Sequence, residues 1–312
     1  MRVREGSARL GALVAVLLVA GCGGGSSGGG GGSGSGPATV RVQDTAGVPA
    51  AFLEYGVKQG YFKKRKLTVQ VKPSQGGATV VPAVVSGSVD IGGSNLVSVL
   101  LAKSKNIPLK VVAPGTFVQT DRTKDFSAII VKGNSPIRSP KDLEGKTLAV
   151  NTLKNVAELT AKASLAKKGV DVSKVKLTEI DFPDMVGAVD KGRVDAAFAI
   201  EPFVSLGLKA GDRIVDRPYV GTKPGLQIGC YFTSQKYLSQ NGGVVKRFQQ
   251  GVADTAASIA KDPQAFRDFL PKGSSIPPAA AQKVILPAWK AKSDQASVAL
   301  TSQLMKRYGL VK

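Results

Sequence analysis

From Pro37 onward, short runs rich in β-branched residues alternate with helical stretches that end at a glycine. Such alternation indicates an α/β fold with mainly parallel strands, because each helix carries the chain back to the same end of the sheet. The first region to show it is predicted to contain strands at 39–43, 67–72, 89–91 and 109–112 and helices at 50–59, from about 78 to Ser86, and at 96–104.

A second region repeats the plan. The run Ser139-Pro140-Lys141-Asp142 is typical of a helix start, with a serine cap and a carboxylate three residues later. Residues 84–90 align with 189–195 at a constant offset, and in both segments a helix ends at glycine before Val-Asp opens a strand. Chance could produce this common connection, but it also fits two lobes built alike. We predict strands at 147–151, 176–180 and 196–200 and helices at 156–168 and 184–191.

The pattern changes after Pro218. Residues 226–233 are predicted to form a strand that returns from the second lobe. Helices without strands are expected at 244–261, 263–270, 278–286 and 293–308. A helical tail of this kind fits a chain that crosses back over its first lobe. We therefore expect lobe I to comprise 37–127 plus 226–312, and lobe II to comprise 128–225.

The N-terminus carries a secretion signature. Three arginines precede an apolar run at 10–20, which is shorter than the roughly 20 residues needed to span a bilayer. The following Val19-Ala20-Gly21-Cys22 resembles a bacterial lipobox. It predicts a lipoprotein signal peptide at 1–21 and a lipid on Cys22, although an ordinary signal peptide with a chance cysteine is the alternative. Residues 23–36 are all glycine or serine, so 22–36 is expected to be a flexible tether.

Composition limits the chemistry. The chain has no histidine, which removes the commonest general base and zinc ligand, so we expect no catalytic residue, metal or cofactor. If Cys22 is lipidated, Cys230 has no disulfide partner, and its apolar surroundings favour a buried, inert thiol.

The net charge of +21 first suggests nucleic acid, but the basic residues are scattered and the longest run, 63–66, lacks interleaved aromatics. We therefore expect no nucleic-acid partner. Two interpretations of the charge stay open, namely attraction to anionic lipid surfaces or anionic ligands, and a solvated surface with no single partner.

Several segments together resemble a known family, the type II periplasmic substrate-binding proteins of ABC transporters, in their nitrate, sulfonate, taurine and thiamine-precursor group. The likeness rests on 51–62 with its Gly-Tyr-Phe turn, 87–92, 139–146, 192–196 and Glu201-Pro202. It implies a two-lobed α/β fold with a central cleft and a helical C-terminal tail. It also implies an extracytoplasmic, monomeric protein that captures a small molecule for a membrane permease. An anionic, nitrogen- or sulfur-containing solute such as a sulfonate, nitrate, taurine or a thiamine pyrimidine precursor is expected. A solute-sensing lipoprotein is an alternative, and a pyrimidine-forming enzyme of the same fold is disfavoured because those enzymes depend on histidine.

Ligand-contacting residues are expected in the loops at the carboxyl ends of the strands, where helix N-termini offer free N–H groups. Each of these polar residues is also a common cap or turn former, which is the alternative interpretation. Glu201 would suit a ligand that carries an amine, or would simply stabilise the helix start at Pro202. The predicted set is Thr45, Gln75, Gly76, Gly77, Ser94, Asn95, Thr116, Phe117, Asn151, Thr152 and Glu201.

Overall fold

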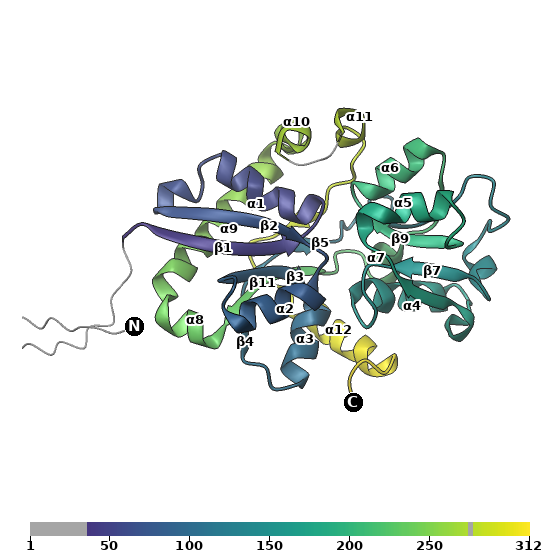
Figure 1. Cartoon of the computed structure of the whole chain (residues 1–312), viewed down its shortest axis with the longest axis horizontal. Coiled ribbons are helices and arrows are strands. Elements are labelled where there is room, and N and C mark those ends of the chain that lie inside the picture. The colour runs from purple at the N-terminus through teal and green to yellow at the C-terminus, as the bar shows by residue number, and fades with distance from the viewer. Residues whose placement is uncertain (1–35, 274–276) are drawn as a thin grey trace, which may run out of the picture. The chain divides into compact units, whose positions relative to one another are not determined.

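The computed structural model describes residues 36–273 and 277–312, so the leader, Cys22 and most of the glycine/serine segment lie outside the described residues. Five strands form a first sheet in the order β2-β1-β3-β11-β4. Strand β1 runs parallel to β2 and β3, whereas β11 is antiparallel to β3 and β4. Their bounds are β1 (Ala38–Thr45), β2 (Leu67–Ser74), β3 (Ile91–Asn95), β4 (Leu109–Pro114) and β11 (Gly229–Ser234) (Figure 1).

The core of this half follows from the alternation in β1. Val40 and Val42 are buried, while Thr39 and Arg41, which alternate with them, are exposed. The two valines belong to the same apolar cluster as Phe52 of α1 (Val48–Lys58) and Phe248 of α9 (Gly242–Lys261). The returning tail helix therefore covers the sheet that begins the fold, as expected.

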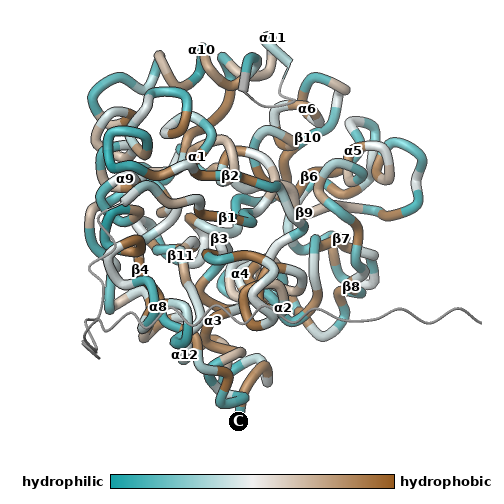
Figure 2. Tube along the Cα trace, turned by 60° about the vertical axis from the view of Figure 1, so that its left-hand side comes forward, coloured by the Kyte–Doolittle hydropathy of each residue, from teal (hydrophilic) through white to brown (hydrophobic). Residues whose placement is uncertain are grey.

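Five further strands form a second sheet in the order β10-β6-β9-β7-β8. Both β6 and β9 are buried along their whole length, and their apolar residues are brown in Figure 2. Continuous apolar runs are typical of strands covered on both faces. The strands are β6 (Ser127–Val131), β7 (Thr147–Val150), β8 (Lys176–Glu179), β9 (Ala196–Ile200) and β10 (Arg213–Asp216), with helices α4 (Val156–Lys167), α5 (Phe182–Asp190), α6 (Phe203–Ala210) and α7 (Pro218–Thr222).

The repeated segment has the same structure in both halves. Gly87 and Gly192 adopt left-handed φ angles of 76° and 64°, which favour glycine. In the first half, Asp90 Oδ2 accepts a hydrogen bond from the Arg41 backbone N–H at 2.8 Å. In the second, Asp195 Oδ2 accepts one from the Thr147 backbone N–H, also at 2.8 Å. The two halves thus share a plan, with β1 beside β3 corresponding to β7 beside β9.

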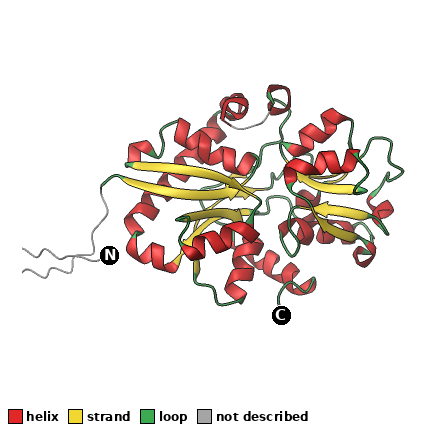
Figure 3. Ribbon diagram, viewed as in Figure 1, coloured by secondary structure: helices red, strands yellow, loops and turns green. Residues whose placement is uncertain are grey.

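Helices flank both sheets (Figure 3). Helix α12 (Gln295–Arg307) contacts both α3 (Leu96–Ser104) and α4, and Met305, Val97 and Leu159 bury one another where the three helices meet. Among residues 36–273 and 277–312, none of the helices combines the length and the hydrophobicity needed to cross a bilayer. The remaining helices are α2 (Gly77–Ser86), α3 (Leu96–Ser104), α8 (Gln235–Gln240), α10 (Pro263–Gly273), α11 (Pro278–Ala281) and α12 (Gln295–Arg307).

The expectation that the tail lacks strands is wrong. Strand β12 (Ala288–Trp289) follows Pro287 and pairs antiparallel with β5 (Thr116–Phe117). Proline disfavours helix in the preceding residue, which fits the extended chain at Leu286 before β12. The Trp289 ring stacks on Phe52 with ring centroids 4.9 Å apart, so the tail packs directly against α1.

Two other expectations need adjustment. The predicted strand at 89–91 forms instead at Ile91–Asn95, so Ser94 and Asn95 end the strand itself. At Ser139 the chain makes only a short 3-10 turn, in which the Ser139 backbone N–H donates to Asp142 Oδ2 at 2.8 Å. Strands β6 and β10 and helices α6 and α7 lie in segments where the alternation predicted no element.

Candidate functional site

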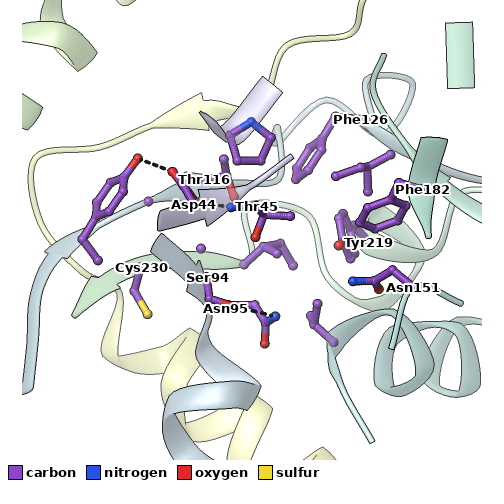
Figure 4. Close-up of a pocket in the computed structure, with 17 residues that line it drawn as sticks. Asp44, Thr45, Ser94, Asn95, Thr116, Phe126, Asn151, Phe182, Tyr219 and Cys230 are labelled. Atoms are coloured by element: carbon purple, nitrogen blue, oxygen red, sulfur yellow. Dashed lines mark hydrogen bonds between the residues drawn. The ribbon is translucent and has the colours of Figure 1, made fainter. Parts of the chain in front are cut away.

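A pocket lies where the carboxyl ends of β1 and β3 of the first sheet approach β7 and β9 of the second. About 520 Å³ is free of atoms, but only ≈ 40 Å³ can hold the centre of a water-sized molecule, so the walls lie close together. A compact ligand would suit such a space. The lining residues come from both halves: Asp44, Thr45, Pro49, Ser94, Asn95, Gly115, Thr116, Phe126, Asn151, Val156, Phe182, Ile200, Tyr219, Ile228, Gly229, Cys230 and Tyr231 (Figure 4).

Hydroxyl and amide groups from the first half form one wall of this pocket. Thr45 ends β1, Ser94 and Asn95 end β3, and Thr116 begins β5. The Asn95 side chain caps α3, because its Oδ1 accepts a hydrogen bond from the Ser98 backbone N–H at 3.0 Å. Asn95 therefore has the capping role that its residue type favours while it also lines the pocket.

Asp44 places a carboxylate in the same wall. It is 4% exposed, and the structure gives it hydrogen bonds from the Thr45 backbone N–H at 2.7 Å and from the Tyr231 hydroxyl at 3.1 Å. Burial raises the pKa of Asp44 to about 7, against the opposing effect of these two donors. No lysine or arginine is found among the described residues that line the pocket, and the chain has no histidine.

Asn151 faces this wall from the end of β7. Its Nδ2 donates to the Gln75 backbone carbonyl at 2.9 Å, a contact that fixes which end of the amide is the donor. The Oδ1 atom is buried and accepts no hydrogen bond within the described chain. An unpartnered buried acceptor costs free energy unless something else donates to it. Asn151 thus lines the pocket while its Oδ1 remains a buried acceptor without a partner among the described residues.

Aromatic side chains form the other wall. Phe126 and Tyr219 lie with ring centroids 5.0 Å apart, and Phe182 packs against Phe203. Figure 4 shows Phe126, Phe182 and Tyr219 on the side opposite Asp44 and Thr45. Sequence reasoning missed all three. It assigned no strand at 127–131 and no helix at 218–222, and it named no residue between the predicted strand 176–180 and the predicted helix 184–191, where Phe182 lies. The apolar run Ser127–Val131 was the signal that could have identified the segment beside Phe126.

Several predicted residues lie at this pocket and others lie beside it. Thr45, Ser94, Asn95, Thr116 and Asn151 line it. A Cβ on Gly76 would lie 3.4 Å from Asn151 Nδ2, so Gly76 is adjacent. Gln75 and Thr152, together with Asn151, line a second and more open groove beside α5.

Gly77 and Phe117 have structural surroundings. A Cβ on Gly77 would fall 1.7 Å from Ser98 Oγ, so glycine is needed where α2 approaches α3. Phe117 is fully buried, with Lys290 Nζ 4.8 Å from its ring centroid. Neither Phe117 nor Gly77 lines the pocket that contains Asp44.

Glu201 also does not line that pocket. Its carboxylate is buried and accepts hydrogen bonds from the Ser205 N–H and hydroxyl, each at 3.0 Å, and from the Ile285 N–H at 3.1 Å. Burial raises the pKa of Glu201, and these donors oppose the shift. The geometry matches the alternative interpretation of Glu201 as a residue that stabilises the start of a helix, here α6, and it additionally ties α6 to the tail.

Cys230 lines the pocket with a thiol of low reactivity. It is 1% exposed, and burial raises the pKa of its thiol to about 12. A thiol of this kind stays protonated and is a poor nucleophile at neutral pH. The buried position predicted for this thiol from the apolar sequence is confirmed. The pocket as a whole offers hydrogen-bond acceptors, hydroxyl groups and aromatic faces, which suit binding.

Comparisons with known proteins agree with this fold. A family model described as NMT1/THI5 like matches residues 50–266. The taurine-binding periplasmic protein of Escherichia coli (strain K12) is 25% identical over 203 residues, or 65% of this chain and 61% of that protein. The match thus spans less than two thirds of the length of the relative.

Solved structures share the architecture. The alkanesulfonate-binding protein SsuA from Xanthomonas axonopodis pv. citri, bound to MOPS, has a TM-score of 0.74 at 20% identity, covering 89% of this chain and 95% of that one. The ligand-binding component of an ABC-type import system from Staphylococcus aureus has a TM-score of 0.76 at 15% identity, covering 87% and 92%. At these identities the likeness establishes the fold, and the predicted two-lobed α/β architecture with a helical C-terminal region is confirmed.

Proposed function

Because the chain belongs to the NMT1/THI5 like family, we propose that it is the solute-binding component of an ABC-type importer. It captures a small solute between its two lobes, releases it unaltered to a membrane permease and carries out no reaction. The observation that carries this proposal is the pocket between the carboxyl ends of the two sheets, lined by residues of both halves. In α/β folds, ligands bind outside the carboxyl ends of the strands.

The solute is a compact compound that contains nitrogen or sulfur. The names of the similar proteins support this class, since they bind taurine and alkanesulfonates. The close pocket walls also favour a small ligand. Hydroxyl groups and helix N-termini can hold a sulfonate without a basic side chain, because free backbone N–H groups and the positive helix end attract oxyanions.

The protein acts outside the cytoplasm, as a monomer held to the membrane by a lipid on Cys22. The lipobox-like sequence and the glycine/serine tether support the anchor. We propose lobe I to be 37–127 with 226–312 and lobe II to be 128–225, since β6 begins the second sheet at Ser127 and β11 returns to the first at Gly229.

A thermal-shift screen of the purified mature chain tests the proposal. Candidate ligands are taurine, alkanesulfonates, nitrate and aminopyrimidines. A ligand that binds only the folded protein raises its melting temperature, by an amount that grows with ligand concentration. We expect at least one organic sulfonate or amine to do so and to be recovered chemically unchanged. Turnover of a bound compound by the folded protein would exclude a binding-only role.

A further inference from the structure

The longest basic run of the sequence, 63–66, lies where the predicted tether joins the fold. Arg247 of α9 connects the two segments. Its Nη1 atom donates hydrogen bonds to the backbone carbonyls of Gly36 and Arg65, each at 2.9 Å. Since Gly36 is the last residue of the predicted tether, one guanidinium group holds the end of the tether against the basic run.

The charges of this run are exposed and little compensated. Lys63, Lys64 and Lys66 are exposed to solvent. Within the described residues, Arg65 alone of the four forms an ion pair, with Asp254 at 2.6 Å. A concentration of positive charge therefore surrounds the point where the chain leaves the fold toward its N-terminus. We call the following residues the basic patch: Lys63, Lys64, Arg65, Lys66 and Arg247.

Charge complementarity and the tether together identify the partner of this patch. Clustered lysines and arginines attract anionic phospholipid head groups, and the attraction acts within a Debye length of about 8 Å at physiological ionic strength. Residues 23–36 are all glycine or serine, and a flexible segment of this length reaches about 20 Å. A chain anchored at Cys22 would therefore keep the basic patch close to the membrane surface.

We propose that the basic patch binds the anionic head groups of the membrane to which the protein is anchored, and so sets the orientation of the tethered domain. The inference rests on the proposed lipid anchor at Cys22. It gives the positive charge of the chain one partner, where the sequence left two interpretations open. The patch alone provides a weak and reversible attachment, and it reinforces a lipid chain as a second signal.

This orientation would leave the ligand pocket accessible, because the patch and the pocket lie at opposite ends of β1. The Ala38 backbone N–H, at the start of the strand, donates to the Lys66 carbonyl at 3.0 Å. Thr45, at the other end, lines the pocket. A strand of eight residues spans about 25 Å. The arrow of β1 in Figure 1 accordingly points toward the second sheet.

The experiment measures how much of the purified mature Cys22→Ala chain sediments with phospholipid vesicles, so that no attached lipid contributes. One set of vesicles contains phosphatidylglycerol, which is anionic, mixed with phosphatidylcholine, and the other contains phosphatidylcholine alone. Binding to the anionic vesicles in about 0.02 M salt should be at least about tenfold tighter than to the neutral ones. It should weaken severalfold in about 0.15 M salt, because the Debye length is shorter.

Two variants with equal net charge separate the patch from the overall charge of the protein. The first carries Lys63→Gln, Lys64→Gln and Lys66→Gln, and its binding to anionic vesicles should fall at least about tenfold. The control removes three exposed lysines at or near the ends of α3, α5 and α6, through Lys105→Gln, Lys191→Gln and Lys209→Gln. Its binding should stay within about threefold of that of the parent chain.

The outcomes distinguish the patch from the anchor. Equal losses in the two triple variants would overturn the patch, because net charge alone would explain the binding. Failure of the Cys22→Ala chain to bind anionic vesicles would overturn it too, and this comparison needs no triple variant, so poor folding of one would not prevent a decision. Tighter binding to soluble polyphosphate than to anionic vesicles would overturn the assignment to lipid. If the native protein carries no lipid but the vesicles still bind, the anchor fails and the patch stands.

Discussion

The Tyr231 hydroxyl donates a hydrogen bond to Asp44 Oδ2 at 3.1 Å, joining β11 to the end of β1 at the wall of the pocket. The contact is between residues 187 positions apart in the chain. A donor aimed at a carboxylate favours its ionised form, so Tyr231 opposes the effect of burial on Asp44.

Tyr231→Phe removes that donor and keeps the ring. The pH midpoint of Asp44 ionisation should then shift upward by about one unit, because a hydrogen bond to a charged group contributes about 1.5 kcal/mol or more. The pH dependence of urea unfolding, measured from pH 5.5 to 8.5, gives this midpoint. Tyr61→Phe is the control, because its hydroxyl bonds Ser258 away from the pocket. An unmoved midpoint would contradict the role given to Tyr231.

The buried carboxylate of Asp44 should also affect stability. Its folded pKa lies above the ordinary value of 3.8, so the folded protein holds a proton that the unfolded chain has lost between about pH 4 and 7. Stability from this group is therefore greatest at low pH and falls as pH rises to 7. Asp44→Asn should raise the free energy of unfolding relative to wild type more at pH 8 than at pH 4, by up to about 4 kcal/mol. Urea unfolding at both pH values measures the difference in free energy of unfolding between the variant and the wild type. An equal difference at pH 4 and pH 8 would contradict the raised pKa of Asp44.

Glu201→Gln should weaken the fold and not the binding. The amide group replaces one of two oxygens that accept from Ser205 and Ile285, and an N–H then faces an N–H. We expect a loss of about 2 kcal/mol in the free energy of unfolding. Ligand affinity should stay within about twofold, because Glu201 does not line the pocket. A large loss of affinity with unchanged stability would restore Glu201 as a ligand-contacting residue.

Gly77→Ala tests the close approach of α2 to α3. The added Cβ would meet Ser98 Oγ at 1.7 Å, which forces the helices apart and should cost about 1–3 kcal/mol. Gly187→Ala is a matched control in α5, where nothing lies within 4 Å of the new atom. That change should be neutral or stabilising by up to about 1 kcal/mol. The melting temperature of Gly77→Ala should therefore fall below that of the wild type, whereas that of Gly187→Ala should stay the same or rise.

Cys22→Ala tests the proposed anchor. Without the cysteine no lipid can be attached, so the protein should appear in the soluble extracytoplasmic fraction and not sediment with membranes. Cys230→Ala is the control, since that buried thiol has no part in anchoring. Undiminished sedimentation of the Cys22→Ala protein at high salt would exclude a lipid anchor and point instead to its positive charge.

The repeated segment shows how far local sequence can lead. Gly87 and Gly192 must adopt left-handed turns, and the Val-Asp that follows each opens a buried strand, so chemistry within a few residues predicts the local structure. What the pattern did not reveal is that Asp90 and Asp195 bond the backbone of a neighbouring strand about 48 residues away. That pairing depends on which strands lie side by side, and periodicity does not encode this.

The amino-acid sequence alone determined the α/β class, the two similar halves, the helical tail and the strand ends that supply Thr45, Ser94, Asn95 and Asn151. These follow from backbone preferences and from the alternation of apolar residues, which act over one or two turns of chain. The tertiary structure decided which polar groups share a pocket. It placed Glu201 among donors that occupy its oxygens, and it left Asn151, a residue of the pocket lining, with a buried Oδ1 that has no partner among the described residues. Burial and hydrogen-bond partners decide whether a carboxylate caps a helix or is available to a ligand, and both come from segments distant in the chain.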